Sequence, residues 1–222
     1  MTVKYVLFDV DDTLFPSTEF AKLARKNAIK AMLGMGMKGN PDQLYKKLLL
    51  IIRREGSNYE GHFDLLCKSL KIKKSAMYVA AAIAAYHNTK LSIKPYPGVR
   101  AMLISLRKKG YKLFVATNGT TIKQWDKLIR MKIALYFDDV FVSQEVGRMK
   151  GKGLFRKVLR ELGAEPDECL MAGDREDADI MPARALGMHT VKVMQGKMAR
   201  ASTAADFKIS TISKLPSVLK RL

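Results

Sequence analysis

The strongest constraint on the fold of this 222-residue chain is the alternation of strand-like and helix-like segments after residue 95. Short apolar runs, typical of buried strands, occupy 111–116, 139–142, 169–172, 190–194 and 206–209. Amphipathic segments of helical length occupy 98–109, 121–131, 152–162 and 177–186, and a short helix follows the last strand. Strands joined by helices of this length predict right-handed crossovers and a parallel sheet.

The residues before position 95 follow a different pattern. Residues 3–8 read as a buried strand, and helical segments then follow at 17–32, 41–55, 59–70 and 75–88. The dense turn sequence Pro95-Tyr96-Pro97-Gly98 ends this helical region. A lone apolar strand cannot bury itself, so residues 3–8 should join the same sheet. We therefore predict a doubly wound, Rossmann-like α/β core formed by 1–15 and 95–222, with an inserted α-helical cap domain at 16–94.

The formal net charge of +19 favours either a nucleic-acid-binding protein or an enzyme that attracts anions. The basic residues are dispersed, without a run of five and without a zinc-finger or RNA-binding signature. A small phosphorylated metabolite is therefore a better expectation than nucleic acid. The longest uncharged apolar stretch, 77–86, is too short to cross a bilayer, and the opening residues lack a signal-peptide pattern, which predicts a cytoplasmic protein without a membrane partner.

Polar residues follow four of the predicted strands. They are the stretches Asp9-Val10-Asp11-Asp12-Thr13, Thr117-Asn118-Gly119, 143–150, and Gly173-Asp174 with Asp179 five residues later. Each stretch alone is typical of an ordinary turn. Because ligands bind at the carboxyl ends of strands in such sheets, the four together indicate an active site.

These stretches resemble the four motifs of the haloacid dehalogenase-like hydrolase superfamily. The resembling segments are Phe8–Leu14, Ala116–Gly119, Glu145–Lys150 and Ala172–Asp174. A helical insert after the first motif is similar to the type 1 cap subfamily. The stretches 56–59, 62–63 and 123–125 are similar to an archaeal branch that includes glyceraldehyde 3-phosphate phosphatases.

The resemblance implies a magnesium-dependent phosphatase that works through an aspartyl-phosphate intermediate on Asp9. Asp11 would protonate the leaving alkoxide and later accept a proton from water. Lys150 would supply a fixed positive charge. Gly151 stands where the family usually has proline, so the sequence leaves open whether Lys150 or Lys152 has this role.

The resemblance also implies a Mg²⁺ site, because four aspartates beside an anionic substrate require a cation. Asp9, the Asp11 backbone carbonyl and Asp174 would be the protein ligands, with Asp179 just outside them. Asp177 is an alternative to Asp179 that the sequence leaves open.

Substrate binding is expected in two places. Thr117 and the backbone amide of Asn118 would donate hydrogen bonds to the phosphate oxygens, together with Lys150. The cap would close over the core and select the substrate. Its candidate residues are Ser57, Asn58, Tyr59 and His62.

Two alternatives to the phosphatase remain at this point. A phosphomutase uses the same pair of carboxylates as Asp9 and Asp11. A nucleic-acid-binding protein on a hydrolase scaffold would explain the charge. The sequence does not indicate an oligomeric state.

Overall fold

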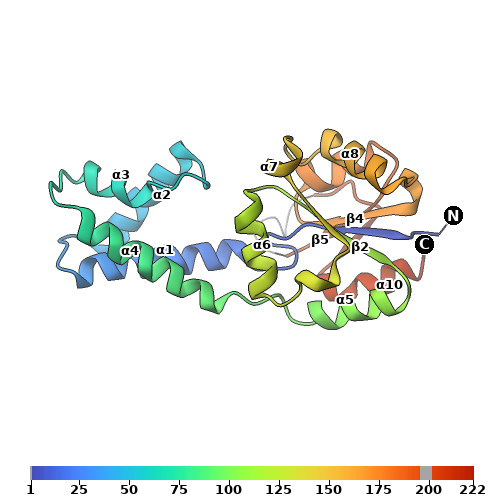
Figure 1. Ribbon diagram of the computed structural model, residues 1–222, viewed down its shortest axis with the longest axis horizontal. Coiled ribbons are helices and arrows are strands. Elements are labelled where there is room, and N and C mark those ends of the chain that lie inside the picture. Colours follow the sequence, from blue (N-terminus) through green and yellow to red (C-terminus); the bar gives the residue numbers. More distant parts are fainter. Residues whose placement is uncertain (1, 196–201) are drawn as a thin grey trace. The chain divides into compact units, whose positions relative to one another are not determined.

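The computed structural model describes residues 2–195 and 202–222 (Figure 1). The chain divides into two compact units. One is formed by Met1–Thr18 with Lys94–Leu222, and the other by Glu19–Ile93.

The first unit is built on a parallel sheet. Within the described residues its six strands are β1 (Tyr5–Phe8), β2 (Lys112–Thr117), β3 (Asp139–Val142), β4 (Cys169–Gly173), β5 (His189–Val193) and β6 (Phe207–Ile209). They lie in the order β3-β2-β1-β4-β5-β6, and every neighbouring pair is parallel. The strand order reverses beside β1, which is the position where doubly wound sheets bind ligands. The predicted α/β fold is confirmed.

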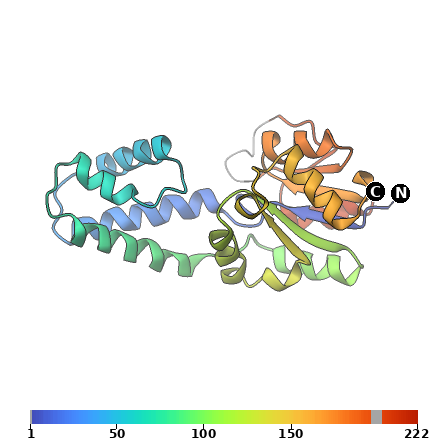
Figure 2. The ribbon, with the colours of Figure 1, turned by 45° about the horizontal axis from the view of Figure 1, so that its top comes forward.

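Helices cover both faces of this sheet, with α8 on one side and α5 and α10 on the other (Figures 1 and 2). The helices of this unit are α5 (Val99–Lys108), α6 (Thr121–Arg130), α7 (Ser143–Val146), α8 (Lys152–Leu162), α9 (Met181–Arg184) and α10 (Leu215–Leu219). Phe114, Phe141 and Met171 of the sheet pack against Leu154 and Phe155 of α8 in one buried cluster. This core fixes the strand ends that carry the polar motifs.

The second unit is helical, as predicted for the insert. Its helices are α2 (Pro41–Glu55), α3 (His62–Ser69), α4 (Ala76–Thr89) and most of α1 (Ser17–Gly34). Met32, Leu48 and Leu66 form part of its separate core. The expected helix start at residue 59 is wrong, because residues 57–61 form a loop and α3 begins at His62. The ring of Tyr59 lies directly against Gly61, where a Cβ atom would be only 2.8 Å from the Tyr59 hydroxyl.

The segment predicted as one helix over 177–186 also differs. It consists of a π-helical turn at Glu176–Ile180 followed by α9. The backbone amides of Asp179 and Ile180 both donate to the Arg175 carbonyl, at 3.0 and 3.3 Å, which widens the turn. A single π turn of this kind often marks a functional site.

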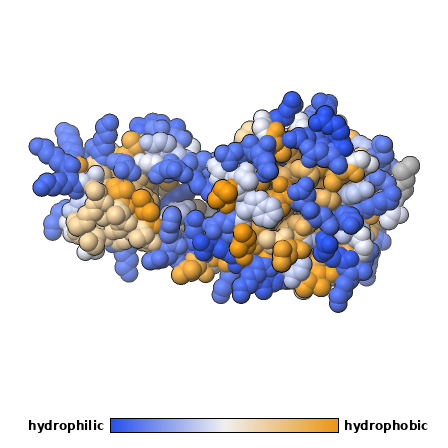
Figure 3. All heavy atoms as spheres, in the orientation of Figure 1, coloured by the Kyte–Doolittle hydropathy of each residue, from blue (hydrophilic) through white to orange (hydrophobic). Residues whose placement is uncertain are grey.

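The visible surface is mostly hydrophilic, with apolar side chains in separate patches (Figure 3). In the described part of the chain, no helix combines the length and hydropathy that crossing a membrane requires.

Candidate active site

The candidate site begins where β1 ends. Phe8 pairs in register with Val115 of β2 and Ala172 of β4, so Asp9 enters the site between the ends of both neighbours. The Asp9 amide donates to the Ala172 carbonyl at 3.0 Å, and the Asp9 side chain is buried. The chain then turns sharply through Asp12, whose φ is 57°. The buried strand and this turn together fix the direction of the Asp9 carboxylate.

Lys150 joins two of the predicted motifs through its side chain. Its buried ammonium pairs with Oδ1 of Asp9 and lies 2.6 Å from Oδ1 of Asp179. Burial acts to lower the pKa of Lys150, but the charges of Asp179 and Asp9 outweigh it and hold that pKa above its ordinary value. Lys152, the alternative considered above, is exposed at the start of α8. The structure therefore brings Lys150 and not Lys152 to Asp9.

Asp9, Asp174 and Asp179 form a buried acidic cluster. One carboxylate oxygen of each lies within 4.8 Å of the others. Burial, and then the neighbouring carboxylates, raise the pKa of Asp9 and of Asp174, while Lys150 opposes the rise. Oδ1 of Asp174 is buried, and it has no hydrogen-bond partner among residues 2–195 and 202–222. When the three carboxylates are ionised, the Lys150 ammonium offsets only one of their negative charges. A bound cation would offset the remaining charge.

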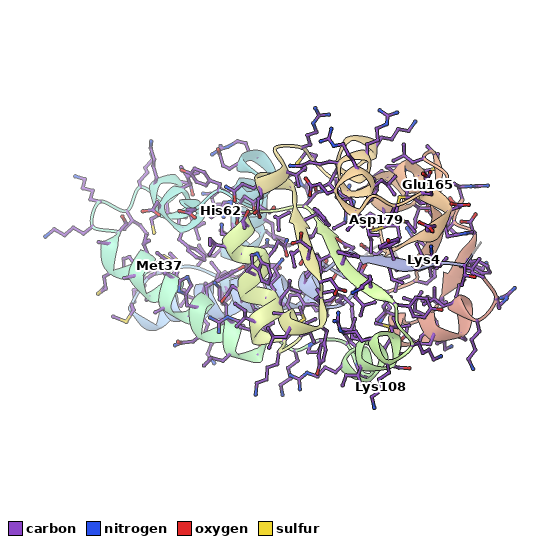
Figure 4. The ribbon with its side chains drawn as sticks, turned by 45° about the vertical axis from the view of Figure 1, so that its right-hand side comes forward. Lys4, Met37, His62, Lys108, Glu165 and Asp179 are labelled. Atoms are coloured by element: carbon purple, nitrogen blue, oxygen red, sulfur yellow. The ribbon has the colours of Figure 1, made fainter. Side chains whose placement is uncertain are left out.

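The fourth motif delivers Asp179, and not Asp177, to this cluster. A Cβ atom on Gly173 would lie 2.2 Å from Oδ2 of Asp179, so only glycine lets this side chain fold back over β4. The Arg175 amide donates to the same oxygen at 2.9 Å. Asp177 points to solvent, where the Arg175 guanidinium lies 2.5 Å from its carboxylate and lowers its pKa. Asp179 is labelled in Figure 4.

The second motif lies beside the third. Thr117 is buried at the end of β2, and Oδ1 of Asn118 accepts a hydrogen bond of 2.6 Å from the Lys150 amide. Ser143, at the end of β3, accepts a hydrogen bond of 3.0 Å from the Gly119 amide. These contacts bring Thr117 and Asn118 into the same loop assembly as Lys150.

Asp11 has partners that the sequence analysis did not identify. Nζ of Lys127 lies 2.6 and 2.8 Å from its two carboxylate oxygens, and Nε2 of Gln124 donates to Oδ2 at 3.1 Å. Both side chains come from α6. A polar residue at the position of Gln124, four residues before the buried Leu128, is the one sequence signal that could have indicated this contact.

Three of the predicted cap residues lie in the loop between α2 and α3, and His62 is the first residue of α3. Ser57, Asn58 and Tyr59 are exposed, and the Tyr59 and His62 rings pack edge to face with centroids 5.4 Å apart. Nε2 of His62 lies 2.9 Å from the Gly56 carbonyl oxygen. His62 is labelled in Figure 4.

The sequence matches the model of the haloacid dehalogenase-like hydrolases over residues 6–193. The chain belongs to this family. A glyceraldehyde 3-phosphate phosphatase of Methanopyrus kandleri is 41% identical over 229 residues, which cover 99% of this chain and 98% of that protein. A protein of the same name from Methanocaldococcus jannaschii is 39% identical over 224 residues, with 99% and 98% covered.

A solved structure of a haloacid dehalogenase-like phosphatase from Thermococcus onnurineus matches with a TM-score of 0.72 and 25% identity, and 98% of each chain is covered. The predicted family is therefore confirmed, and the chain is a hydrolase of the phosphatase class.

Proposed function

We propose that this chain is a Mg²⁺-dependent phosphatase that hydrolyses a small phosphate monoester through a phosphoryl group carried on Asp9. The observation that carries the proposal is the buried Lys150 ammonium, which pairs with both Asp9 and Asp179 at the ends of β1 and β4. A nucleophilic carboxylate beside a fixed cation suits attack on a phosphate ester.

The donor set of the acidic cluster fits Mg²⁺. Its ligands would be carboxylate oxygens of Asp9 and Asp174 with the backbone carbonyl of Asp11, while Asp179 remains paired with Lys150. Magnesium prefers oxygen ligands and retains several waters, so three protein ligands are enough for such a site. When bound, it would offset the negative charge of the carboxylates and of the substrate phosphate.

Each residue of the site would have a separate role in the reaction. Asp9 forms the bond to phosphorus, and Asp11 passes a proton to the oxygen of the departing alcohol. Thr117, the Asn118 amide and Lys150 bind the phosphate oxygens as they gain charge. Water then attacks the phosphoryl group on Asp9, with Asp11 accepting the proton.

The relatives suggest a substrate. Two archaeal proteins about 40% identical to this chain are named glyceraldehyde 3-phosphate phosphatases, and each match covers almost the whole chain. We propose glyceraldehyde 3-phosphate as the first substrate to test. We further propose that Met1–Thr18 with Lys94–Leu222 is the catalytic core and that Glu19–Ile93 is a cap. In this cap, Ser57, Asn58, Tyr59 and His62 would contact the substrate.

The decisive experiment measures phosphate release from p-nitrophenyl phosphate and glyceraldehyde 3-phosphate, in Mg²⁺ and in EDTA. We expect Mg²⁺-dependent hydrolysis that Asp9→Asn lowers by at least about 10³-fold, since a nucleophile is lost. Asp177→Asn removes an exposed aspartate of the fourth motif and should retain activity within about threefold. Mass spectrometry after acid quench should find the phosphoryl adduct on the peptide containing Asp9. Full activity of Asp9→Asn would refute the proposal.

A further inference from the structure

Helix α6 supplies two side chains to Asp11, and neither has a role in the mechanism above. Nζ of Lys127 contacts both carboxylate oxygens of Asp11, at 2.6 and 2.8 Å. Nε2 of Gln124, which is 3% exposed, donates to Oδ2 of the same carboxylate at 3.1 Å. Asp11 is therefore held in one place by three contacts, although about a third of its side chain is exposed.

The two carboxylates of the first motif are held by different lysines. Asp9 pairs with the buried Lys150 and belongs to the acidic cluster with Asp174 and Asp179. Asp11 is only two residues away, yet it does not belong to that group of closely spaced carboxylates. An aspartate so near a cation site could become a side-chain ligand of the cation. The contacts of Asp11 with Lys127 and Gln124 keep its carboxyl group away from that role. The carboxyl group stays available for proton transfer.

Gln124 also ties this arrangement to the second motif. Its Nε2 donates to the Asn118 carbonyl at 2.7 Å, in addition to its contact with Asp11. Gly119 makes this approach possible, because a Cβ atom there would lie 2.7 Å from Nε2 of Gln124, and its φ is +142°. The loop proposed to bind phosphate and the proposed acid are thus connected through one buried amide.

We propose that Lys127 and Gln124 are positioning residues that hold the Asp11 carboxyl group apart from the acidic cluster and aim it at the leaving oxygen. This inference rests on the proposed function. As the bond from Asp9 to phosphorus forms and the phosphorus–oxygen bond to the alcohol breaks, the proton of the Asp11 carboxyl moves to that oxygen. The carboxylate left on Asp11 is then stabilised by the Lys127 ammonium.

The proposal predicts a dependence on the leaving group. A departing alkoxide needs the proton, whereas p-nitrophenolate leaves without one. The ratio kcat/KM reports only the steps up to departure of the leaving group, so hydrolysis of the phosphoryl-enzyme does not enter it. We expect Lys127→Met to lower kcat/KM about 10- to 100-fold for glyceraldehyde 3-phosphate, whose leaving group is an alkoxide, part of the roughly 10²–10⁴-fold that a positioned acid contributes. For p-nitrophenyl phosphate the loss should stay below about threefold.

Three further variants make the test specific. Lys108→Met removes an equal charge from an exposed position on α5 (labelled in Figure 4) and should leave kcat/KM unchanged for both substrates. Gln124→Met removes the other donor and also the contact with the Asn118 carbonyl, so kcat/KM should fall for both substrates, and more for glyceraldehyde 3-phosphate than for p-nitrophenyl phosphate. Adding Lys127→Met to Asp11→Asn should cause little further loss, because a positioning residue acts only through the group it positions.

A second measurement does not depend on turnover. It is the Mg²⁺ concentration at which Tm has risen by half of its maximal increase. If Lys127 positions Asp11 and does not contribute to the acidic cluster, this concentration should change less than about threefold in Lys127→Met. Equal losses for both substrates, or additive losses in the double variant, would overturn the proposal. The proposed function is tested separately by Mg²⁺-dependent hydrolysis of p-nitrophenyl phosphate in the unmodified chain and its loss in Asp9→Asn.

Discussion

At the scale of single residues, the acidic cluster makes stability depend on both pH and Mg²⁺. Burial, and then nearby carboxylates, raise the pKa of Asp9 to about 7 and that of Asp174 to about 8 without metal. An unfolded aspartate has a pKa of about 3.9. At these two residues the folded, metal-free chain therefore binds more protons than the unfolded chain from about pH 4 to pH 8, and their contribution to the free energy of unfolding falls as pH rises through this window.

A divalent cation binds the ionised carboxylates and so competes with those protons. We expect the rise in Tm caused by Mg²⁺ to be larger at pH 8 than at pH 6. Thermal unfolding in EDTA and in Mg²⁺ at the two pH values measures this difference. Asp174→Asn, which removes a proposed ligand and one titrating group, should lose most of the effect. Equal Mg²⁺ shifts at both pH values in the unmodified chain would contradict the prediction.

Gly173 gives a second prediction at this scale. Alanine would place its Cβ atom 2.2 Å from Oδ2 of Asp179, so Gly173→Ala must push that buried carboxylate away from Lys150. We expect a loss of roughly 1–3 kcal/mol in the free energy of unfolding, as for other overpacked cores, together with loss of most phosphatase activity. Chemical denaturation and phosphate release measure the two effects. Gly34→Ala is the control, because a Cβ atom there has open space.

The sequence predicted part of this site for a clear physical reason. Asp9, Thr117 and Asp174 directly follow apolar runs, and parallel strands bring their carboxyl ends together. The sequence favoured Lys150 over Lys152 and Asp179 over Asp177, but it left both choices open. Each depends on how a short irregular segment turns, at 143–151 and at 175–180, and residue types do not specify that turn.

At the scale of elements, α2 shows how local sequence decides where a helix begins. Oδ1 of Asn40 accepts hydrogen bonds from the amides of Asp42 and Gln43, and Pro41 occupies the first turn. Asn40→Ala should lower the free energy of unfolding by about 1 kcal/mol, since two amides lose their acceptor. Denaturant unfolding measures this change, and Asn40→Asp should retain most of the stability because aspartate caps equally well. An alanine variant as stable as the original would show that the cap contributes little.

Helix α6 shows where prediction from local sequence ends. Its amphipathic pattern predicted the helix, and Leu128 packs on the buried side as expected. The pattern did not predict that Lys127, one of forty lysines and arginines, would reach Asp11. That contact requires the helix to lie across the end of β1, and only the tertiary arrangement of the first unit determines this.

At the scale of the whole molecule, the alternation of strands and helices predicted the parallel, doubly wound sheet but not its strand order, and the net charge of +19 did not select a function by itself. A positive field concentrates anions near the protein and is screened by salt, with a Debye length of about 10 Å at 0.1 M and about 3 Å at 1 M. For a phosphatase, this field should act on the binding of the dianionic substrate and leave the chemistry inside the buried site largely unaffected.

We therefore expect KM for p-nitrophenyl phosphate to rise several-fold as NaCl is raised from about 0.05 to about 0.5 M, while kcat changes less than about twofold. Steady-state kinetics at fixed pH and saturating Mg²⁺ measure both constants. Titration with double-stranded DNA at about 0.15 M NaCl tests the competing explanation, since a nucleic-acid-binding protein would bind tightly and with a steep dependence on salt. A constant KM together with tight DNA binding would assign the charge to nucleic acid. A rising KM with weak DNA binding would assign it to the attraction of small phosphorylated substrates.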